Sequence, residues 1–384
     1  MLDKRRKNDK IKILRKIKKE RVMKRILLVF TGGTICSSPD KEGKNHSDAR
    51  GTGSYLEINF KASDSPFSDK VEFDRRYLPT DILSENMTVD TWNDLVEVFK
   101  DKSLRQRYEG VVILHGTDTL AYTSALLSIL LSGFPIPVCL VSAQLELTDS
   151  RTNGYDNFRG AVELIMNGIA PNVYAVYRNL KNDAHEGGEL FVHCGAHLRQ
   201  CPNFSDNFHS LTEMRVPDIK NARLKGRRFL TESLYVDRTE KLSDGVLMIT
   251  PHTNMRYDRI CLDGVRAIVH GTYHAQSVCV GRAENKDENE VLTLQKVREA
   301  DKPYSILFLL ERCEEKGIPV FLAPCDREQY RYGSTAAALN SGAIAAGRIT
   351  PESAYAKLIV GVSLGYGGKD LVTFMGTNVN GEII

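Results

Sequence analysis

The sequence lacks the features that mark several specialised classes of protein. Its eight cysteines stand singly, without a Cys-x-x-Cys pair, so neither a zinc knuckle nor a disulfide framework is indicated, and we expect a reducing, cytoplasmic compartment. The longest apolar run, near residues 125–131, is far too short to span a bilayer, which argues against an integral membrane protein. The basic N-terminus has no apolar core or small-residue cleavage site, so we expect no secretory signal.

Acidic residues are scarce at the N-terminus and in excess elsewhere. Residues 1–25 carry 13 Lys/Arg and 3 Asp/Glu, whereas the remainder has a net charge of −7. This mildly acidic body gives no support for a nucleic-acid-binding surface. We expect residues 1–24 to be a disordered basic leader or an artefact of the start site, because Met23 stands just before the first predicted strand. A basic amphipathic helix touching membrane or RNA is the alternative interpretation.

What the chain does have is an alternation of strand-length apolar runs with amphipathic, helix-length segments. The 384 residues, 42% of them apolar, are enough for large buried cores, and the alternation predicts an α/β fold with a parallel sheet. We expect an N-terminal α/β domain over residues 25–210, a linker over 211–243 and a smaller C-terminal α/β domain over 244–384. The predicted strands are 26–30, 110–114, 136–142, 173–178, 189–194, 245–250, 264–270 and 318–323. The predicted helices are 91–100, 120–131, 157–166, 303–316, 335–340 and 350–358.

Two glycine-containing polar motifs follow predicted strands. They are Thr31-Gly32-Gly33-Thr34 and His115-Gly116-Thr117-Asp118. Ligands of open parallel sheets bind beyond the carboxyl ends of the strands, where glycine allows close backbone approach, threonine offers a hydroxyl and aspartate can hold an amine. Neither motif has the spacing of a phosphate-binding or dinucleotide-binding loop, so no nucleotide cofactor is indicated. Each motif alone would be typical of a tight turn with a capping threonine, and two at adjacent strand ends favour a site.

Together these motifs resemble those of the bacterial-type L-asparaginases. The matching segments are 25–35, 82–88, 110–119, 137–158 and 342–358. The resemblance implies an N-terminal parallel-sheet domain with a smaller C-terminal α/β domain. It also implies hydrolysis of the side-chain amide of asparagine, sometimes glutamine, without metal or cofactor, in a homodimer or homotetramer.

The resemblance also implies roles for five residues. Thr34 matches the nucleophile that forms an acyl-enzyme, and Thr117 matches the second catalytic threonine, which belongs to the proton-transfer group. Asp118 matches the residue that binds the α-amine of the substrate. Ser84 matches the serine that holds the α-carboxylate, and Glu85 the polar residue after it. A threonine hydroxyl needs a base, and the oxyanion needs preorganised donors, which a glycine-rich turn can supply.

The sequence departs from the family pattern where a lysine supports the second threonine. The corresponding segment, residues 192–209, contains no lysine, and Lys181 stands in a predicted hairpin turn upstream. Loss of a positioned base typically costs about 10²–10⁴ in rate. His193, Arg199 and Arg151 are the groups we consider as replacements, although surface or structural hydrogen bonding explains each of them too.

Further residues have weaker functional interpretations. Residues 37–55 have the composition of a mobile lid over Thr34. The tyrosine of the family's flexible loop has no clear counterpart here, and Tyr55 is the residue we consider for it. His270 and His274 lie four residues apart after a predicted strand, but no third ligand supports a zinc site, and we expect none. Trp92 is expected to pack in the core.

Three functions remain open. The first is an L-asparaginase acting on asparagine as a small-molecule substrate. The second is an enzyme acting on another amide, such as glutamine or a substrate of amidated-tRNA synthesis. The third, favoured by the missing lysine, is a catalytically weak protein that only binds an amino acid.

Overall fold

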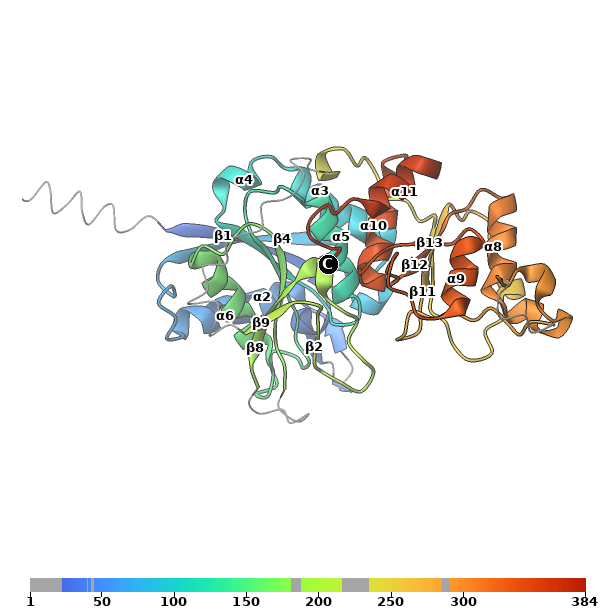
Figure 1. The fold of residues 1–384 in the computed structure, drawn as a ribbon. Helices are drawn as coiled ribbons and strands as arrows, with labels where there is room; N and C mark the ends of the chain where they lie inside the picture. Colours follow the sequence, from blue (N-terminus) through green and yellow to red (C-terminus); the bar gives the residue numbers. More distant parts are fainter. Residues whose placement is uncertain (1–22, 40, 43–44, 181–187, 216–234, 285–290) are drawn as a thin grey trace, which may run out of the picture.

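The computed structural model describes residues 23–39, 41–42, 45–180, 188–215, 235–284 and 291–384. Two sheets with their helices lie side by side in it (Figure 1). The predicted leader lies outside the described residues up to residue 22, and so does Lys181. Part of the predicted linker, residues 216–234, is also outside them, so the domain boundaries stay a prediction.

Within the described residues, the first sheet has seven strands. In order across the sheet they are β4 (Val71–Ile82), β1 (Lys24–Gly32), β5 (Gly110–Leu114), β6 (Val138–Val141), β7 (Val173–Arg178), β8 (Leu190–Cys194) and β9 (Glu213–Arg215). The pairs from β4 to β7 are parallel, and β8 and β9 are added antiparallel. The hairpin expected from the sequence is therefore the β7–β8 pair.

Helices cover both faces of this sheet. They are α2 (Ala49–Ala62), α3 (Val89–Lys100), α4 (Leu104–Arg107), α5 (Leu120–Leu130) and α6 (Gly154–Met166). Leu27 and Val29 of β1 pack with α3 and α5, whereas Leu28 and Phe30 pack with α2 and α6. A central strand covered on both faces has no polar side, which is why residues 26–30 of β1 and all of β5 form continuous apolar runs. Trp92 is buried in this core, as predicted.

The second sheet is parallel throughout. Its strands are β10 (Val246–Ile249), β11 (Ala267–Gly271), β12 (Val320–Ala323) and β13 (Ile344–Ala345), and its helices are α8 (Ile306–Glu315), α9 (Gly333–Asn340), α10 (Pro351–Ser363) and α11 (Gly368–Gly376). Helices α8 and α9 pack on one face, and α10 and α11 pack on the other. Helix α10 also packs against α5, so one apolar core continues from the first sheet to the second. The predicted α/β class with two sheet-centred parts is confirmed.

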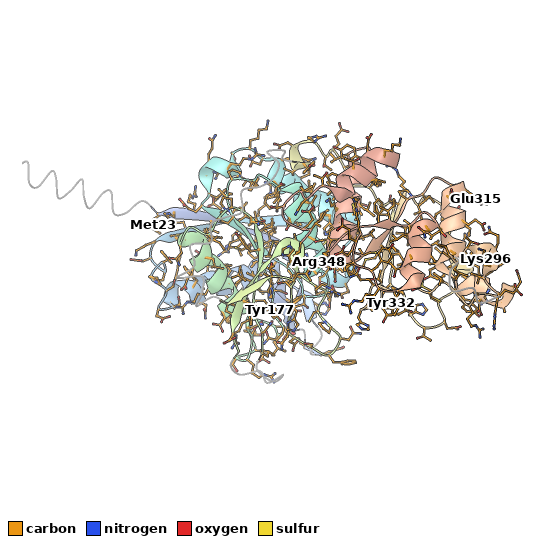
Figure 2. All side chains as sticks on the ribbon, viewed as in Figure 1. Met23, Tyr177, Lys296, Glu315, Tyr332 and Arg348 are labelled. Atoms are coloured by element: carbon orange, nitrogen blue, oxygen red, sulfur yellow. The ribbon has the colours of Figure 1, made fainter. Side chains whose placement is uncertain are left out.

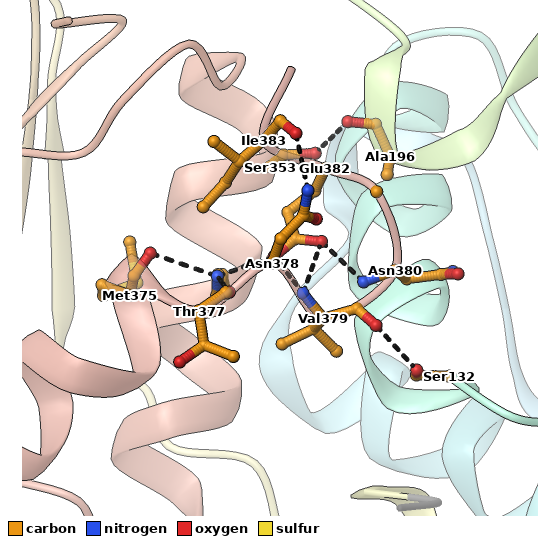
Figure 3. Close-up of polar contacts among 12 residues, drawn as sticks. Ser132, Ala196, Ser353, Met375, Thr377, Asn378, Val379, Asn380, Glu382 and Ile383 are labelled. Atoms are coloured by element: carbon orange, nitrogen blue, oxygen red, sulfur yellow. Dashed lines mark hydrogen bonds and ion pairs between the residues drawn. The ribbon is translucent and has the colours of Figure 1, made fainter. Parts of the chain in front are cut away.

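The C-terminal residues connect α10 to the end of α5 (Figure 3). Lys357 Nζ and Glu382 Oε1 are 2.6 Å apart, and both side chains are fully buried. Glu382 also accepts hydrogen bonds from the backbone N–H groups of Val379 and Asn380, while Ser132, just after α5, donates to the Val379 carbonyl. Burial lowers the pKa of the Lys357 ammonium group. This pairing lets two buried charges satisfy one another instead of being exposed to an apolar core.

Most predicted elements are confirmed, and the segment interpreted as a lid contains strands and a helix that were not predicted, while its mobility stays a prediction. Within this segment, β2 (Ser37–Pro39) pairs antiparallel with β3 (Asn45–Ser47), and Tyr55 lies on helix α2 rather than on a loop. The long edge strand β4 was not predicted. The helix expected from residue 303 begins at Ile306, because Pro303 belongs to a 3₁₀ turn before it. In the parts of the chain that the structure describes, no helix has the length and apolarity needed to cross a membrane.

Candidate active site

The two threonine-glycine motifs meet at the carboxyl ends of β1 and β5. These strands are parallel neighbours, with Phe30 opposite Leu114, so the loops that follow them emerge at the same edge of the sheet. Gly33 has a φ of 82°, and a Cβ atom on it would lie 2.2 Å from the Gly116 Cα. Only glycine allows the two loops to approach so closely. The structure therefore brings the predicted motifs into backbone contact.

Ser84 joins the same cluster from a third segment. It begins the 3₁₀ helix η2 (Ser84–Asn86), directly after β4. Its hydroxyl donates to Asp118 Oδ2 at 3.0 Å and accepts from the Asp118 backbone N–H at 3.2 Å. Thr119 donates to the Ser84 carbonyl at 3.0 Å. Ser84 and Asp118, predicted as substrate-binding residues, are thus held side by side, whereas Glu85 is exposed on η2.

The backbone around Thr34 is fixed by its neighbours. Thr34 begins the 3₁₀ helix η1 (Thr34–Cys36), whose other two residues are buried. Thr31 donates to the Leu114 carbonyl at 2.9 Å, and Ser37 donates to the Gly33 carbonyl at 2.8 Å. No hydrogen bond of the Thr34 hydroxyl to another described residue is present, so this hydroxyl is free to meet a ligand.

Thr117 and Asp118 open onto a pocket of about 380 Å³. Its other lining residues are Tyr177, Gln200, Cys201, Pro202, Asn203, Phe204, Ser205, Asp206 and Phe208. None of these described lining residues is a lysine or a histidine, and Thr34 is not among them. The Thr117 hydroxyl, like that of Thr34, is not hydrogen-bonded to any residue that the structure describes. Burial raises the pKa of the Cys201 thiol to about 11, which keeps it protonated and unreactive near neutral pH.

His115 supports the second loop from within the sheet. Its side chain is fully buried, and Nδ1 lies 2.8 Å from the Gly116 carbonyl oxygen. Burial lowers the pKa of His115 to about 4, so the imidazole is neutral at neutral pH. Its Nε2 atom is buried and has no hydrogen-bond partner among the described residues. His115 therefore shapes the loop without bringing a positive charge to the site.

The side chains considered as replacements for the lysine lie outside this pocket. Arg199 pairs with Glu352 at 3.5 Å, and Arg151 pairs with Asp149 at 2.6 Å on the surface. His193 is buried, its Nδ1 lies 2.9 Å from Ser210 Oγ, and burial lowers its pKa to about 4. A histidine with so low a pKa is a poor base near pH 7.

Gln200 is the residue of this region that sequence reasoning missed. Its Nε2 atom donates to the Asp118 carbonyl at 2.6 Å, and its backbone N–H donates to Glu352 Oε1 at 2.8 Å. A replacement for the lysine in segment 192–209 is expected to be charged or titratable, and a neutral amide gives no such signal. Only the folded chain shows that Gln200 reaches the Thr117–Asp118 loop.

The polar side-chain atoms at His270 and Thr272 are hydrogen-bonded to neighbouring groups of the protein. Tyr257 Oη lies 2.8 Å from His270 Nε2, and Thr272 donates to the Pro324 carbonyl at 2.8 Å. Among the described residues, no group of three or more His, Cys, Asp and Glu side chains is placed to hold a metal ion.

Comparison with known proteins gives consistent relatives. L-asparaginase 1 of Escherichia coli (strain K12) is 24% identical over 375 residues, covering 94% of this chain and 98% of that protein. One of the subunits of the glutamyl-tRNA(Gln) amidotransferase of Methanosphaera stadtmanae is 23% identical over 379 residues, covering 94% of this chain and 77% of that protein. The solved structure of the thermostable L-asparaginase from Thermococcus kodakarensis has a TM-score of 0.65 at 21% identity and covers 94% of this chain and 99% of that one. This last likeness supports the fold.

A family model described as "Asparaginase, N-terminal" matches residues 25–227, the part that holds both threonine loops, Ser84 and Gln200. The match spans more than half of the 384-residue chain. The chain therefore belongs to the asparaginase family and is an amidohydrolase.

Proposed function

We propose that the protein hydrolyses the side-chain amide of L-asparagine to L-aspartate and ammonia through an acyl-enzyme on Thr34. The observation that carries this proposal is the contact between the loops that follow β1 and β5, with the hydrogen-bonded Ser84–Asp118 pair beside them. Two free hydroxyls and one carboxylate at a single sheet edge suit a small zwitterion with a reactive carbonyl.

In this proposal each polar group binds a different part of the substrate. Asp118 binds the α-ammonium group, since an exposed carboxylate attracts a cation, and Ser84 donates to the α-carboxylate, with Glu85 next to it. Binding would exchange the present bond from Ser84 to Asp118 Oδ2 for bonds to the substrate. The side-chain amide would then lie between the Thr34 and Thr117 hydroxyls, the two groups that no other described residue occupies.

The reaction would take place in two halves. Thr34 Oγ attacks the amide carbon, its proton passes to the leaving nitrogen with the help of Thr117, and the C–N bond breaks to release ammonia. Water then attacks the ester, returns a proton to Thr34 Oγ and releases aspartate. Backbone N–H groups of the glycine-rich turns would stabilise the oxyanion in both halves.

Ammonia release tests this function. Purified wild-type protein with L-asparagine should release ammonia, and Thr34→Ala should reduce the rate by at least about 10³-fold, as loss of a nucleophile does. Thr253→Ala, in an exposed loop, is the matched control and should leave the rate unchanged. Ammonia release that survives Thr34→Ala would contradict the mechanism.

A second candidate function is amide hydrolysis of glutamine or of an amidated substrate. It is favoured by the similarity to the amidotransferase subunit, which extends over 94% of this chain. The ratio of kcat/KM for asparagine to that for glutamine separates the two, and a preference for glutamine would favour the second. Calorimetry that finds tight aspartate binding, with no ammonia released from either amide, would assign a binding role instead.

We further propose that the active form is a homodimer or homotetramer, as the family resemblance implies. Light scattering coupled to size-exclusion chromatography measures the mass directly. A monomer that retains full asparaginase activity at assay concentrations would contradict this assembly.

A further inference from the structure

We infer that Gln200 is a positioning residue for the Thr117–Asp118 loop, and that Glu352 on α10 positions Gln200 in turn. The inference rests on the proposed function, because it assumes that this loop binds the substrate. It assigns to the segment without a lysine a neutral hydrogen-bond donor, Gln200, which is anchored by a residue of α10. Tyr177, labelled in Figure 2, lines the same pocket as Gln200.

The first contact in this series reaches the binding loop itself. Gln200 Nε2 donates to the Asp118 carbonyl at 2.6 Å, and the Asp118 side chain accepts from Ser84. The carbonyl and the carboxylate belong to the same residue, so holding one restricts the other.

The second contact anchors Gln200. Glu352 lies in the first turn of α10, is 4% exposed, and accepts the Gln200 backbone N–H at 2.8 Å through Oε1. Its other oxygen, Oε2, lies 3.5 Å from Arg199 Nε. A carboxylate in the first turn of a helix is favoured by the helix dipole, so the anchor is itself stabilised. Glu352 thus holds the backbone of Gln200 through one oxygen, while its other oxygen makes, among the described residues, only the longer ion pair with Arg199.

Helix α10, which carries Glu352, is itself held in place by several hydrogen bonds. Thr350 caps its N-terminus by accepting the Ser353 N–H at 3.1 Å, and Ser353 donates to the Ala196 carbonyl. His197 Nε2 lies 2.6 Å from the Gly381 carbonyl oxygen in the C-terminal segment. These contacts join α10, the segment that leads to Gln200 and the C-terminal residues of Figure 3 into one packed unit.

Gln200 also belongs to the lining of the same pocket. Gln200 lines it together with Thr117 and Asp118, and its Oε1 atom is buried without a hydrogen-bond partner among the described residues. A glutamine that served only the fold would be expected to have both amide atoms paired. The amide also leaves the charge of Asp118 unopposed, which favours binding of an ammonium group.

Two substitutions of Gln200 test the inference. Gln200→Met and Gln200→Glu keep the side-chain length and remove the donor. We expect each to raise the KM for asparagine and the Kd for aspartate together by about tenfold, with a smaller fall in kcat, because a displaced binding loop weakens both. Tm should stay within a few degrees of wild type. Gln106→Ala, at an exposed position of α4, is the control and should change nothing.

Glu352 gives a rescue series. Glu352→Gln keeps an oxygen for the Gln200 N–H and should remain within about twofold of wild type, whereas Glu352→Ala should show the binding defect of Gln200→Met. Glu315→Ala, exposed on α8, is its control. If Glu352→Ala fails to fold, the Gln200 variants still decide the matter.

The outcomes separate this inference from the proposed function. Wild-type activity with unchanged KM and aspartate Kd in both Gln200 variants overturns the inference alone. Suppose instead that the Gln200 variants lose affinity for aspartate, while the wild-type protein releases no ammonia. This result would support the positioning role and overturn the proposed hydrolysis. A loss of affinity that only accompanies a collapse of Tm overturns the positioning role.

Discussion

In each of the two sheets, one central strand ends in the same tripeptide, His-Gly-Thr. After β5 it is His115-Gly116-Thr117, and at the end of β11 it is His270-Gly271-Thr272. Both histidines are buried, with Nδ1 at 2.8 Å and 2.6 Å from the carbonyl oxygen of the following glycine. Burial lowers the pKa of each to about 4. Up to this point the two strand ends are equivalent.

They differ in what the remaining polar atoms meet. His270 Nε2 is paired with Tyr257, and the Thr272 hydroxyl donates to the Pro324 carbonyl. His115 Nε2 and the Thr117 hydroxyl have no such partner among the described residues. We call the first strand end open, because these polar atoms of His115 and Thr117 have no partner among the described residues. We call the second strand end closed, because those of His270 and Thr272 are hydrogen-bonded within the fold. A short motif becomes a site only where its surroundings leave its polar groups unoccupied.

The largest expected effect comes from removing the hydroxyl at each strand end. Thr117→Ala should lower kcat for asparagine by about 10²–10⁴-fold, since it removes a member of the proposed proton-transfer group. Thr272→Ala, the matched change, should leave kcat within about twofold. Steady-state ammonia release measures both. Equal losses in the two variants would abolish the distinction between an open and a closed strand end.

Lowering the pH should reduce the free energy of unfolding through the buried histidine of each strand end. Each histidine has a pKa near 4 in the folded protein and near 6.5 unfolded, so the unfolded state binds more protons between these values. The free energy of unfolding should therefore be level above pH 7 and fall from about pH 6.5 to pH 4, by up to about 3 kcal/mol for each buried histidine.

Urea unfolding at a series of pH values measures this slope. His270→Gln should reduce this slope without changing activity at pH 7, because the side chain is buried in the second sheet and is paired with Tyr257. A slope unaffected by the loss of His270 would show that this imidazole does not stay neutral in the folded protein.

The residue after each tripeptide should matter at one end only. Asp118→Asn should raise the Kd for aspartate by about 10–100-fold, because it removes the charge that binds the ammonium group. The counterpart change, Tyr273→Phe, should leave the Kd unchanged. Isothermal titration calorimetry provides the values, and equal affinity in wild type and Asp118→Asn would exclude Asp118 as the ammonium site.

The smallest effect is expected from a substitution that leaves His270 Nε2 unpaired, as His115 Nε2 is among the described residues. Tyr257→Phe removes the hydroxyl that pairs with His270 Nε2 and should cost about 1–3 kcal/mol of stability, the usual penalty for leaving one buried polar atom unpaired. Asparaginase activity should not change. Chemical denaturation measures the loss, and a variant as stable as wild type would mean that the Tyr257–His270 pair contributes nothing.

Sequence reasoning predicted those elements whose patterns are set by burial alone. Residues 26–30 of β1 and the whole of β5 are apolar because helices cover both faces of these strands. Helix α2 was missed because Gly51, Thr52 and Gly53 have low helix propensity. In the fold, Asp48 caps this helix by accepting the Gly51 N–H, and Gly53 packs against Phe30, where a Cβ atom would lie 2.6 Å from the ring. These tertiary contacts override the local preference.

The same contrast applies to the site. The adjacency of the Thr34 and Thr117 segments could be predicted, because neighbouring parallel strands end at one edge of a sheet. The approach of Gln200 could not, since it depends on where the segment after β8 crosses the pocket and on a carboxylate more than 150 positions later in the chain. Its neutral amide also carries none of the signals that mark a titratable group.

A crystal structure with bound L-aspartate tests the central claim most directly. We expect the α-ammonium group on Asp118, the α-carboxylate on Ser84 and the side-chain carboxylate between the Thr34 and Thr117 hydroxyls, with Gln200 still bound to the Asp118 carbonyl. Aspartate bound elsewhere, or bound here with either hydroxyl out of reach of its side chain, would contradict the account.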